Sequence, residues 1–112
     1  MQLIIDGYAD KEKLEDIVLI YNLLDNFPSE IGMNKIMPPF VFIHNSPKLE
    51  ESGISGFVII AESHISMHTF PYKNLVNIDV FSCRSFDSKH AIDFFKEKLN
   101  LGDIRTKTLE RG

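Results

Sequence analysis

The spacing of apolar residues predicts a strand and then a helix within the first thirty residues. Residues 2–8 (QLIIDGY) form a short apolar run that is typical of a strand. Asp10 is a candidate N-cap for a helix that extends to about Leu24, and Pro28 follows as a natural stop. The predicted apolar face of this helix repeats at three- and four-residue spacing and consists of Leu14, Ile17, Val18, Tyr21 and Leu24.

Aromatic and β-branched residues then gather in short runs that predict strands, with polar or proline-containing segments between them. The predicted strands span residues 40–44, 56–61, 62–70 and 75–83, with a polar loop over 45–53 and a turn over 71–74. A second helix is predicted over about 88–99, with Asp87 as its N-cap and Gly102 as its end. Its apolar stripe consists of Ala91, Ile92, Phe95 and Leu99. Residues 103–109 complete the pattern as a last strand.

This order of elements predicts a single domain over residues 1–112 with an α+β fold. The expected architecture is a two-layer α/β sandwich, in which a mostly antiparallel sheet carries two helices on one face. The helices leave the other face of such a sheet open. A second copy of the chain is the simplest cover, so we expect a homodimer.

The strands on either side of the turn at 71–74 define a hairpin whose register follows from the pattern. If Phe70 pairs with Leu75, side chains alternate between two faces of very different character. One face is apolar and consists of Ile65, Met67, Ile78 and Val80. The other gathers His64, Ser66, His68, Asn77, Asp79 and Phe81, with Glu62 across from Cys83 at the open end. A shift by one residue would mix the two sets.

Composition and charge narrow the classes of function. The 112 residues are 44% hydrophobic and 25% charged, an ordinary globular mixture, and the formal charge is −4. An acidic chain lacks the basic face that nucleic-acid binding requires, so we expect no nucleic-acid partner. No apolar run approaches the ~20 residues that span a bilayer, and the N-terminal segment is unlike a secretory signal. Cys83 is the one cysteine and cannot form an intrachain disulfide. We therefore expect no membrane association and a cytoplasmic location.

His64, His68 and Glu62 are residue types that bind metals, but their spacing does not favour a shared ion. On a regular strand the two histidines would lie ~13 Å apart, whereas zinc binds its ligands at ~2.0–2.3 Å. We therefore predict no metal site. The polar face also has plain structural alternatives: His68 would hydrogen-bond across the sheet to Asn77, and Cys83 would be a small buried hydrophobe.

One stretch of the sequence is similar to a known family. GISGFVIIAESHISMHTFP, followed by NIDVFSC, resembles the prokaryotic S-adenosylmethionine decarboxylase proenzymes. In that family a Ser-Gly pair precedes an apolar strand, and E-S-H, H-T-aromatic-P and D-V-F-x-C follow in this order. Weaker similarity covers the opening QLIIDGY and the closing ERG. The family is pyruvoyl-dependent, so the resemblance implies a cofactor made from the chain itself.

The resemblance also implies roles for particular residues. Ser63 would attack the carbonyl of Glu62, the chain would split between these two residues, and Ser63 would become an N-terminal pyruvoyl group. Its ketone would form a Schiff base with the amine of a small-molecule substrate and accept electrons as CO₂ leaves. Ser55 and His68 match the positions that assist self-cleavage, and Cys83 matches the position that donates a proton to the product. In the family, two cleaved protomers pair sheet face to sheet face.

Several positions that bind the nucleoside substrate in the family are different here. Phe70 stands in place of a tryptophan, and Tyr72 in place of a glutamate that grips the ribose hydroxyls. A tyrosine can donate one hydrogen bond but is not a bidentate anionic acceptor. Leu49 lies near the position of an aromatic residue that stacks on adenine, and Arg84 replaces a glycine. The candidate substrate-binding residues are therefore Phe70, Tyr72 and Leu49.

Three hypotheses about function follow. The first is a self-cleaving S-adenosylmethionine decarboxylase that serves polyamine and spermidine synthesis. The second, suggested by Tyr72 and Leu49, is a pyruvoyl-dependent decarboxylase of another amino acid, such as arginine or ornithine. The third is a non-cleaving homologue with a regulatory or binding role. We order the hypotheses first, second and third, with little between the first two. The third has no positive support, because Ser63, His68 and Cys83 are all retained.

Overall fold

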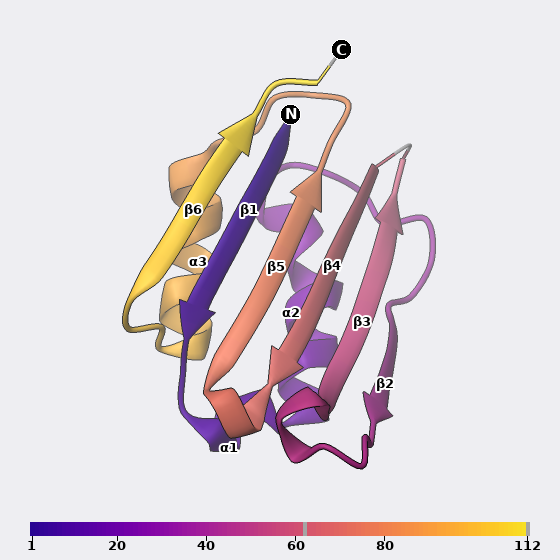
Figure 1. The fold of residues 1–112 in the computed structure, drawn as a ribbon. Coiled ribbons are helices and arrows are strands. Elements are labelled where there is room, and N and C mark those ends of the chain that lie inside the picture. The colour runs from indigo at the N-terminus through magenta and orange to yellow at the C-terminus, as the bar shows by residue number, and fades with distance from the viewer. Residues whose placement is uncertain (62, 112) are drawn as a thin grey trace.

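A six-stranded antiparallel sheet forms one layer of the molecule, and helices form the other (Figure 1). The computed structural model describes residues 1–61 and 63–111. The strands are β1 (Gln2–Tyr8), β2 (Phe40–His44), β3 (Gly53–Ile60), β4 (Ser63–Phe70), β5 (Leu75–Phe81) and β6 (Ile104–Leu109). They lie in the order β2-β3-β4-β5-β1-β6. The predicted α+β sandwich with a mostly antiparallel sheet is confirmed.

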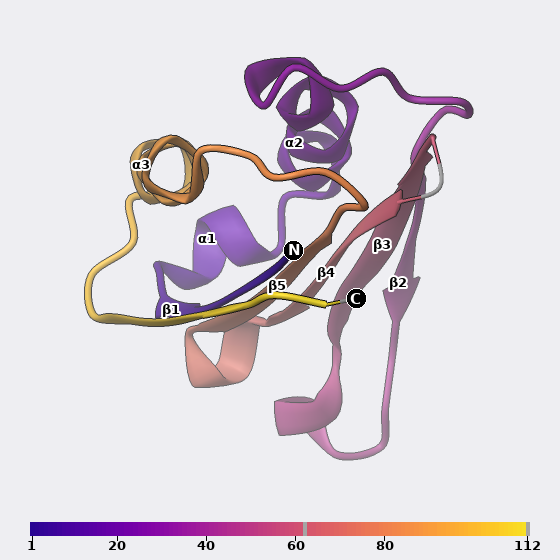
Figure 2. The same ribbon diagram turned by 90° about the horizontal axis from the view of Figure 1, so that it is seen from above.

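The helices all lie on one face of the sheet (Figure 2). They are α1 (Lys11–Leu14), α2 (Ile17–Glu30) and α3 (Ser88–Leu99). Two single 3₁₀ turns, η1 (Leu49–Glu51) and η2 (Pro71–Lys73), lie in the loops before β3 and before β5. We call the face that carries no helix the open face. The core fills the space between the helices and the other face of the sheet.

The predicted bounds of the first helix are wrong. Asp10 precedes only the four-residue α1, and its side chain makes no capping hydrogen bond. Asp16 caps the longer helix α2, because its Oδ1 accepts from the backbone N of Leu19 at 3.1 Å. Pro28 does not stop α2 but lies buried inside its last turn. A proline there removes one helical hydrogen bond, and α2 ends two residues later.

This restart also changes which residues of the first helical segment face the core. Val18, which is 65% exposed, and Tyr21 point away from the sheet, contrary to the prediction. The buried face of α2 consists of Ile20, Leu23, Leu24, Phe27 and Pro28. These residues still follow helical spacing, so the predicted helix is present. The face that it turns toward the sheet differs from the predicted one.

The second predicted helix agrees with α3, whose cap Asp87 accepts from the backbone N of His90 at 3.0 Å. Ala91, Phe95 and Leu99 are buried and Ile92 is half-buried, as the stripe predicted. The helix ends at Asn100, in the left-handed conformation with φ 52°, and not at Gly102. Asparagine is one of the few residues besides glycine that adopt this conformation readily.

The register of the central hairpin is confirmed, since Phe70 pairs with Leu75. The residues predicted to face the core, Ile65, Met67, Ile78 and Val80, are fully buried. The turn between the strands contains η2 and ends at Asn74, whose φ is 55°. Strand β3 begins at Gly53, three residues earlier than predicted, because it pairs there with His44 of β2. The hairpin therefore presents one apolar face to the helices and one polar face to the open side.

Candidate active site

Ser63 and Cys83 meet at the end of the hairpin. Ser63 is the first residue of β4, faces the helix layer and is 5% exposed. Cys83 lies two residues beyond the end of β5 and is exposed. The backbone N–H of Cys83 donates to Oγ of Ser63 at 3.0 Å. The hydroxyl of the proposed nucleophile is thus held by the backbone of the proposed proton donor.

A cavity of about 120 Å³ lies beside these two residues. Its lining is formed by Met33, Asn34, Ile60, Ala61, Ser63, Ser82, Cys83 and Arg84. Met33 and Asn34 lie in the loop between α2 and β2. Arg84 Nη2 reaches the carbonyl oxygen of Gly32 at 3.5 Å and so connects the two loops that line the cavity. Sequence reasoning missed Asn34 and Ser82 as residues of this site.

Ser55 and His68 form a second group, on the open face. They are cross-strand partners on β3 and β4, and Ser55 Oγ lies 2.9 Å from His68 Nδ1. The alternative hydrogen bond from His68 to Asn77 is not the one found. Asn77 faces His68 in the register, but its Nδ2 donates to Asp6 Oδ1 at 2.7 Å. A row of polar side chains therefore crosses the open face, and Asp6 is a member that the sequence did not suggest.

One protomer does not bring the two groups together. His68 is five residues from Ser63 on the same strand, a separation of ~16 Å at the usual rise of a strand. The two side chains also point to opposite faces, because burial along β4 alternates and Ser63 is buried where His68 is exposed. Ser55 accompanies His68. The ~16 Å along the strand therefore keeps Ser55 and His68 from acting on Ser63 of the same protomer in this arrangement.

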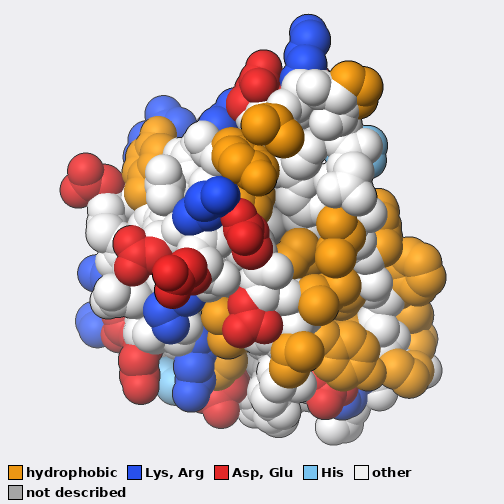
Figure 3. Space-filling view, turned by 90° about the horizontal axis from the view of Figure 1, so that it is seen from below, with side chains coloured by type: hydrophobic (Ala, Val, Ile, Leu, Met, Phe, Trp, Pro, Cys, Tyr) orange, Lys and Arg blue, Asp and Glu red, His pale blue; other side chains and the backbone are white. Residues whose placement is uncertain are grey.

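The candidate substrate-binding residues lie at the opposite end of the sheet from Ser63 (Figure 1). Phe70 ends β4, ~23 Å along the strand from Ser63. Tyr72 is in η2 and Leu49 is in η1, and both side chains are exposed. Hydrophobic side chains gather at one side of this end of the molecule (Figure 3). Ile43 in β2, Leu49 in η1 and Tyr72 in η2 are exposed apolar residues.

Tyr72 has a charged neighbour and a cavity beside it. Lys11 Nζ lies 4.3 Å from the centre of the Tyr72 ring. The pKa of Lys11 is raised above its ordinary value, first by the side-chain hydrogen bond to Glu15 and less by Tyr72. The cavity has a volume of about 240 Å³, and its lining includes Glu15, Ile43 and Tyr72. Tyr72 is therefore placed to contact a ligand, but not one that also contacts Ser63 of its own protomer.

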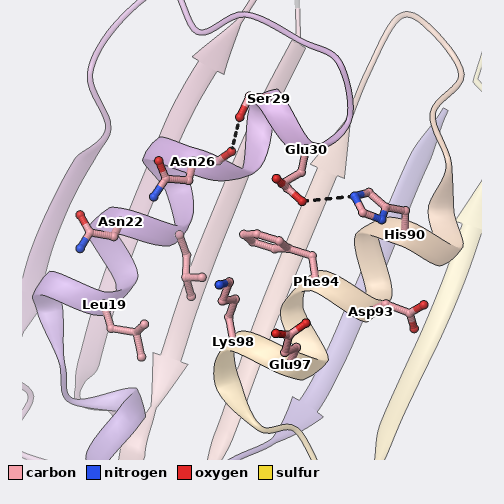
Figure 4. A pocket seen from close by; sticks show the side chains of 11 residues that line it. Leu19, Asn22, Asn26, Ser29, Glu30, His90, Asp93, Phe94, Glu97 and Lys98 are labelled. Atoms are coloured by element: carbon pink, nitrogen blue, oxygen red, sulfur yellow. Dashed lines mark hydrogen bonds and ion pairs between the residues drawn. The ribbon is translucent and has the colours of Figure 1, made fainter.

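A larger cavity, of about 640 Å³, lies between α2 and α3 on the helix side of the molecule (Figure 4). Its polar lining includes Glu30 and His90, whose Oε1 and Nε2 lie 3.2 Å apart. None of the described candidate residues contributes to it. The larger cavity is therefore separate from Ser63 and Cys83, the pair whose chemistry fits the predicted site.

Three further expectations concern Glu62, a metal site and a membrane-spanning helix. Glu62, on the other side of the expected cleavage point, lies outside the described residues. Within the described part of the chain, no cluster of three metal-binding side chains is present. The described helices are also too short or too polar to cross a membrane.

Comparison with known proteins places the chain in a family. The family model of S-adenosylmethionine decarboxylase matches residues 1–112. The S-adenosylmethionine decarboxylase proenzyme of Clostridium botulinum (strain Langeland) is 39% identical over 112 residues, covering 98% of this chain and 91% of the relative. That of Pyrococcus furiosus is 32% identical over 105 residues, covering 93% and 67% respectively. That of Geobacillus sp. (strain WCH70) is 42% identical over 65 residues, covering 58% and 52%.

A solved structure agrees with these sequence relatives. The crystal structure of the adenosylmethionine decarboxylase from Aquifex aeolicus superposes with a TM-score of 0.81 at 30% sequence identity. The superposition covers 99% of this chain and 88% of that one. The resemblance inferred from the E-S-H and D-V-F-x-C motifs is therefore confirmed over the whole fold. The chain belongs to the S-adenosylmethionine decarboxylase family.

Proposed function

We propose that the chain is a proenzyme that cleaves itself between Glu62 and Ser63 and then decarboxylates S-adenosylmethionine for polyamine and spermidine synthesis. The observation that carries the proposal is the buried hydroxyl of Ser63, held by the backbone N–H of Cys83 at 3.0 Å. Membership of the family supports the substrate, since the relatives named above are S-adenosylmethionine decarboxylases. No relative named above favours arginine, ornithine or a non-cleaving role.

The first chemical step belongs to Ser63. Its Oγ adds to the carbonyl carbon of Glu62, the carbon–nitrogen bond of the peptide breaks, and the hydroxyl proton ends on the nitrogen of Ser63. The product is an ester within the chain. Loss of the Cα proton of Ser63 then breaks the bond between Cβ and Oγ, which frees the carboxylate of residue 62. The double bond left between Cα and Cβ moves to Cα and the nitrogen as Cβ takes up a proton and the nitrogen gives one up. Water then adds to Cα and ammonia leaves, which gives the ketone of the pyruvoyl group.

The surroundings of Ser63 fit a pyruvoyl group, which is what these steps would leave at the new N-terminus. Ser63 supplies all of its carbon atoms, and the adjoining cavity of about 120 Å³ gives room next to it. The pyruvoyl group supplies an electron sink when CO₂ is lost from a bound amine. Cys83 would deliver a proton from Sγ to the substrate carbon after CO₂ has left. A cytoplasmic location is part of the proposal, because an exposed thiol stays reduced there.

A second copy of the chain would complete the site. Ser55 and His68 lie on the open face, where they cannot reach Ser63 of their own protomer. We therefore propose that two protomers stack their open faces about a two-fold axis that runs across the strands. This axis reverses the strand direction, so the end of one sheet that carries Tyr72 lies over the end of the other that carries Ser63.

Apolar side chains on the open face support such a contact. Phe40, Phe42 and Phe57 are 54%, 45% and 38% exposed on β2 and β3. Their ring centres are 5.7 Å apart for Phe40 and Phe42, and 5.8 Å apart for Phe40 and Phe57. Burial of aromatic rings is a major source of interface stability. The cluster would be covered when the open faces meet.

The proposal is tested first by the mass of the purified chain under denaturing conditions after long incubation. Two fragments that meet between residues 62 and 63, with a pyruvoyl start on the second, are the expected result. Ser63→Ala should leave the chain whole and inactive. Release of CO₂ from S-adenosylmethionine, compared with arginine and ornithine in parallel assays, identifies the substrate. Activity in the Ser63→Ala protein would refute the pyruvoyl mechanism, and release from an amino acid alone would refute the substrate.

Co-expression of two variants that are impaired in self-cleavage tests whether the site is shared between protomers. His68→Ala should cleave slowly because it lacks the histidine, and Ser63→Ala cannot cleave because it lacks the nucleophile. In a dimer of these two variants, one of the two sites combines an intact His68 from one protomer with an intact Ser63 from the other. Co-expression should therefore restore cleavage of the His68→Ala chain. No restoration in dimers shown to be mixed would place the histidine in the same protomer as its serine.

A further inference from the structure

We infer that Ser82 is a positioning residue for self-cleavage: its hydroxyl holds the backbone bend that aims the N–H of Cys83 at Oγ of Ser63. The inference rests on the proposed function and deepens it. Ser82 occupies the unspecified position of the D-V-F-x-C motif, so neither the motif nor the resemblance assigns it a role.

Ser82 is held from several sides at the point where β5 has just ended. It is 1% exposed. Its Oγ accepts from the backbone N of Arg84 at 3.0 Å and donates to Sδ of Met33 at 3.6 Å. Its backbone N donates to the carbonyl oxygen of Met1 at 2.9 Å. The side chain and the main chain of Ser82 therefore fix the segment that follows.

The next two backbone N–H groups use serine hydroxyls in place of strand partners. Cys83 N donates to Ser63 Oγ and Arg84 N donates to Ser82 Oγ, each at 3.0 Å. A hydroxyl that accepts from the N–H two residues later is a known way to stabilise a local turn. Cys83 lies between Ser82 and Arg84, so this turn sets the direction of the Cys83 N–H. Ser82 thus acts on Ser63 through Cys83 and does not touch it directly in this network.

The direction of the Cys83 N–H matters because it holds the nucleophile. Attack on a carbonyl requires the oxygen to approach to about 3–3.5 Å along a restricted direction, and a displacement of about 1 Å can cost about 100-fold in rate. Without the Ser82 hydroxyl, the N–H of Arg84 loses its acceptor and the bend is free to relax. We therefore expect Ser82→Ala to slow self-cleavage by about 10- to 100-fold.

The test compares Ser82→Ala with two matched variants. Ser82→Thr keeps a hydroxyl at the same position and should restore the rate to near the wild-type value. Ser85→Ala removes the hydroxyl of an exposed serine in the same loop and should leave the rate unchanged. The precursor of each is purified quickly, and the cleaved fraction is followed by mass under denaturing conditions. Addition of hydroxylamine, which cleaves esters, shows whether the ester has formed.

Four outcomes are decisive. In Ser82→Ala, slow cleavage that hydroxylamine does not accelerate would place the defect in ester formation, as expected. Rapid cleavage by hydroxylamine would place it in the later elimination and overturn the inference. Equal rates for wild type and Ser82→Ala, in chains that do cleave, would also overturn it while leaving the proposed function intact. A wild-type chain that never cleaves would instead overturn the proposed function itself.

Amide hydrogen exchange measures the positioning without any cleavage. In the Ser63→Ala chain, which stays whole, the N–H of Arg84 still has the Ser82 hydroxyl as its acceptor. Adding Ser82→Ala should accelerate its exchange by at least about tenfold, the equivalent of losing one hydrogen bond of about 1.4 kcal/mol. Adding Ser82→Thr should not. Unchanged exchange in the Ser82→Ala chain would show that the hydroxyl does not hold the bend.

Discussion

Thr69 connects three elements through one buried hydroxyl, and its replacement by valine should destabilise the fold measurably. Its Oγ1 accepts from the backbone N of Ile54 at 3.0 Å and donates to the carbonyl oxygen of Leu14 at 2.8 Å. These bonds join β4 to β3 and to α1. Thr69 is 2% exposed, so water does not replace either partner readily. Valine has nearly the same shape but can make neither bond.

The expected cost follows from the two groups that valine would leave unsatisfied. Each buried donor or acceptor without a partner costs about 1–3 kcal/mol. The N–H of Ile54 and the carbonyl of Leu14 both lose their partner. We therefore expect Thr69→Val to lower the free energy of unfolding by about 2–6 kcal/mol. Thr69→Ser keeps both bonds and removes one methyl group, for a cost of about 1 kcal/mol.

The assay is urea unfolding of the Ser63→Ala chain, which stays whole, at one fixed protomer concentration because an associating protein gains stability with concentration. Comparison at equal denaturant slope isolates the change in stability. The expected order of stability is the parent, then Thr69→Ser, then Thr69→Val. If Thr69→Val were as stable as Thr69→Ser or more so, the two hydrogen bonds would not stabilise the fold as argued.

Three further predictions concern other parts of the fold. Gly53→Ala would place a Cβ closer to the backbone oxygen of Thr69 than van der Waals contact allows, so we expect the chain not to fold. Circular dichroism would show this, and a melting curve like that of the parent would contradict it. Phe95→Ala leaves a cavity at a fully buried site under α3 and should lower the free energy of unfolding in urea by about 3–5 kcal/mol. A decrease below about 1 kcal/mol would mean that neighbouring side chains fill the cavity. The hydrogen bond from Lys89 lowers the pKa of Asp93 below its ordinary value. The pair therefore stabilises the fold fully at pH values above the pKa that Asp93 has in the unfolded chain. This stabilisation is lost as the pH falls through the lower pKa that Asp93 has in the folded chain. Lys89→Ala should raise the pKa of Asp93 in an NMR titration, and an unchanged pKa would disprove the contact in solution.

Much of the sheet could be predicted because the alternation of apolar and polar residues along each strand shows which side chains face the core. The register of β4 and β5 follows from apolar residues that match across the two strands, and a shift by one residue would bury polar side chains. The second helix was predicted for a similar reason, since Asp87 and a clear stripe define its start and its buried side. The start and the buried face of the first helix were not, because Asp10 and Asp16 both have side chains suited to an N-cap. Packing of the segment after Asp16 against the sheet decided between them.

The sequence alone is enough to name the candidate residues for the chemistry. The motifs name Ser63, His68 and Cys83, and alternation along the strand already places His68 on the polar face. Only the tertiary structure decided how these residues are grouped. It joins Ser63 to the backbone of Cys83 and leaves His68 with Ser55 on the other face.

The physical reason is that motif spacing is measured along the chain, whereas hydrogen bonds depend on where the chain leaves the sheet. The bend after β5, held by Ser82, brings the N–H of Cys83 to a serine twenty residues earlier. Strand alternation is periodic and therefore legible in a sequence. A bend that ends a strand has no period, and the three-dimensional packing of its neighbours determines its direction.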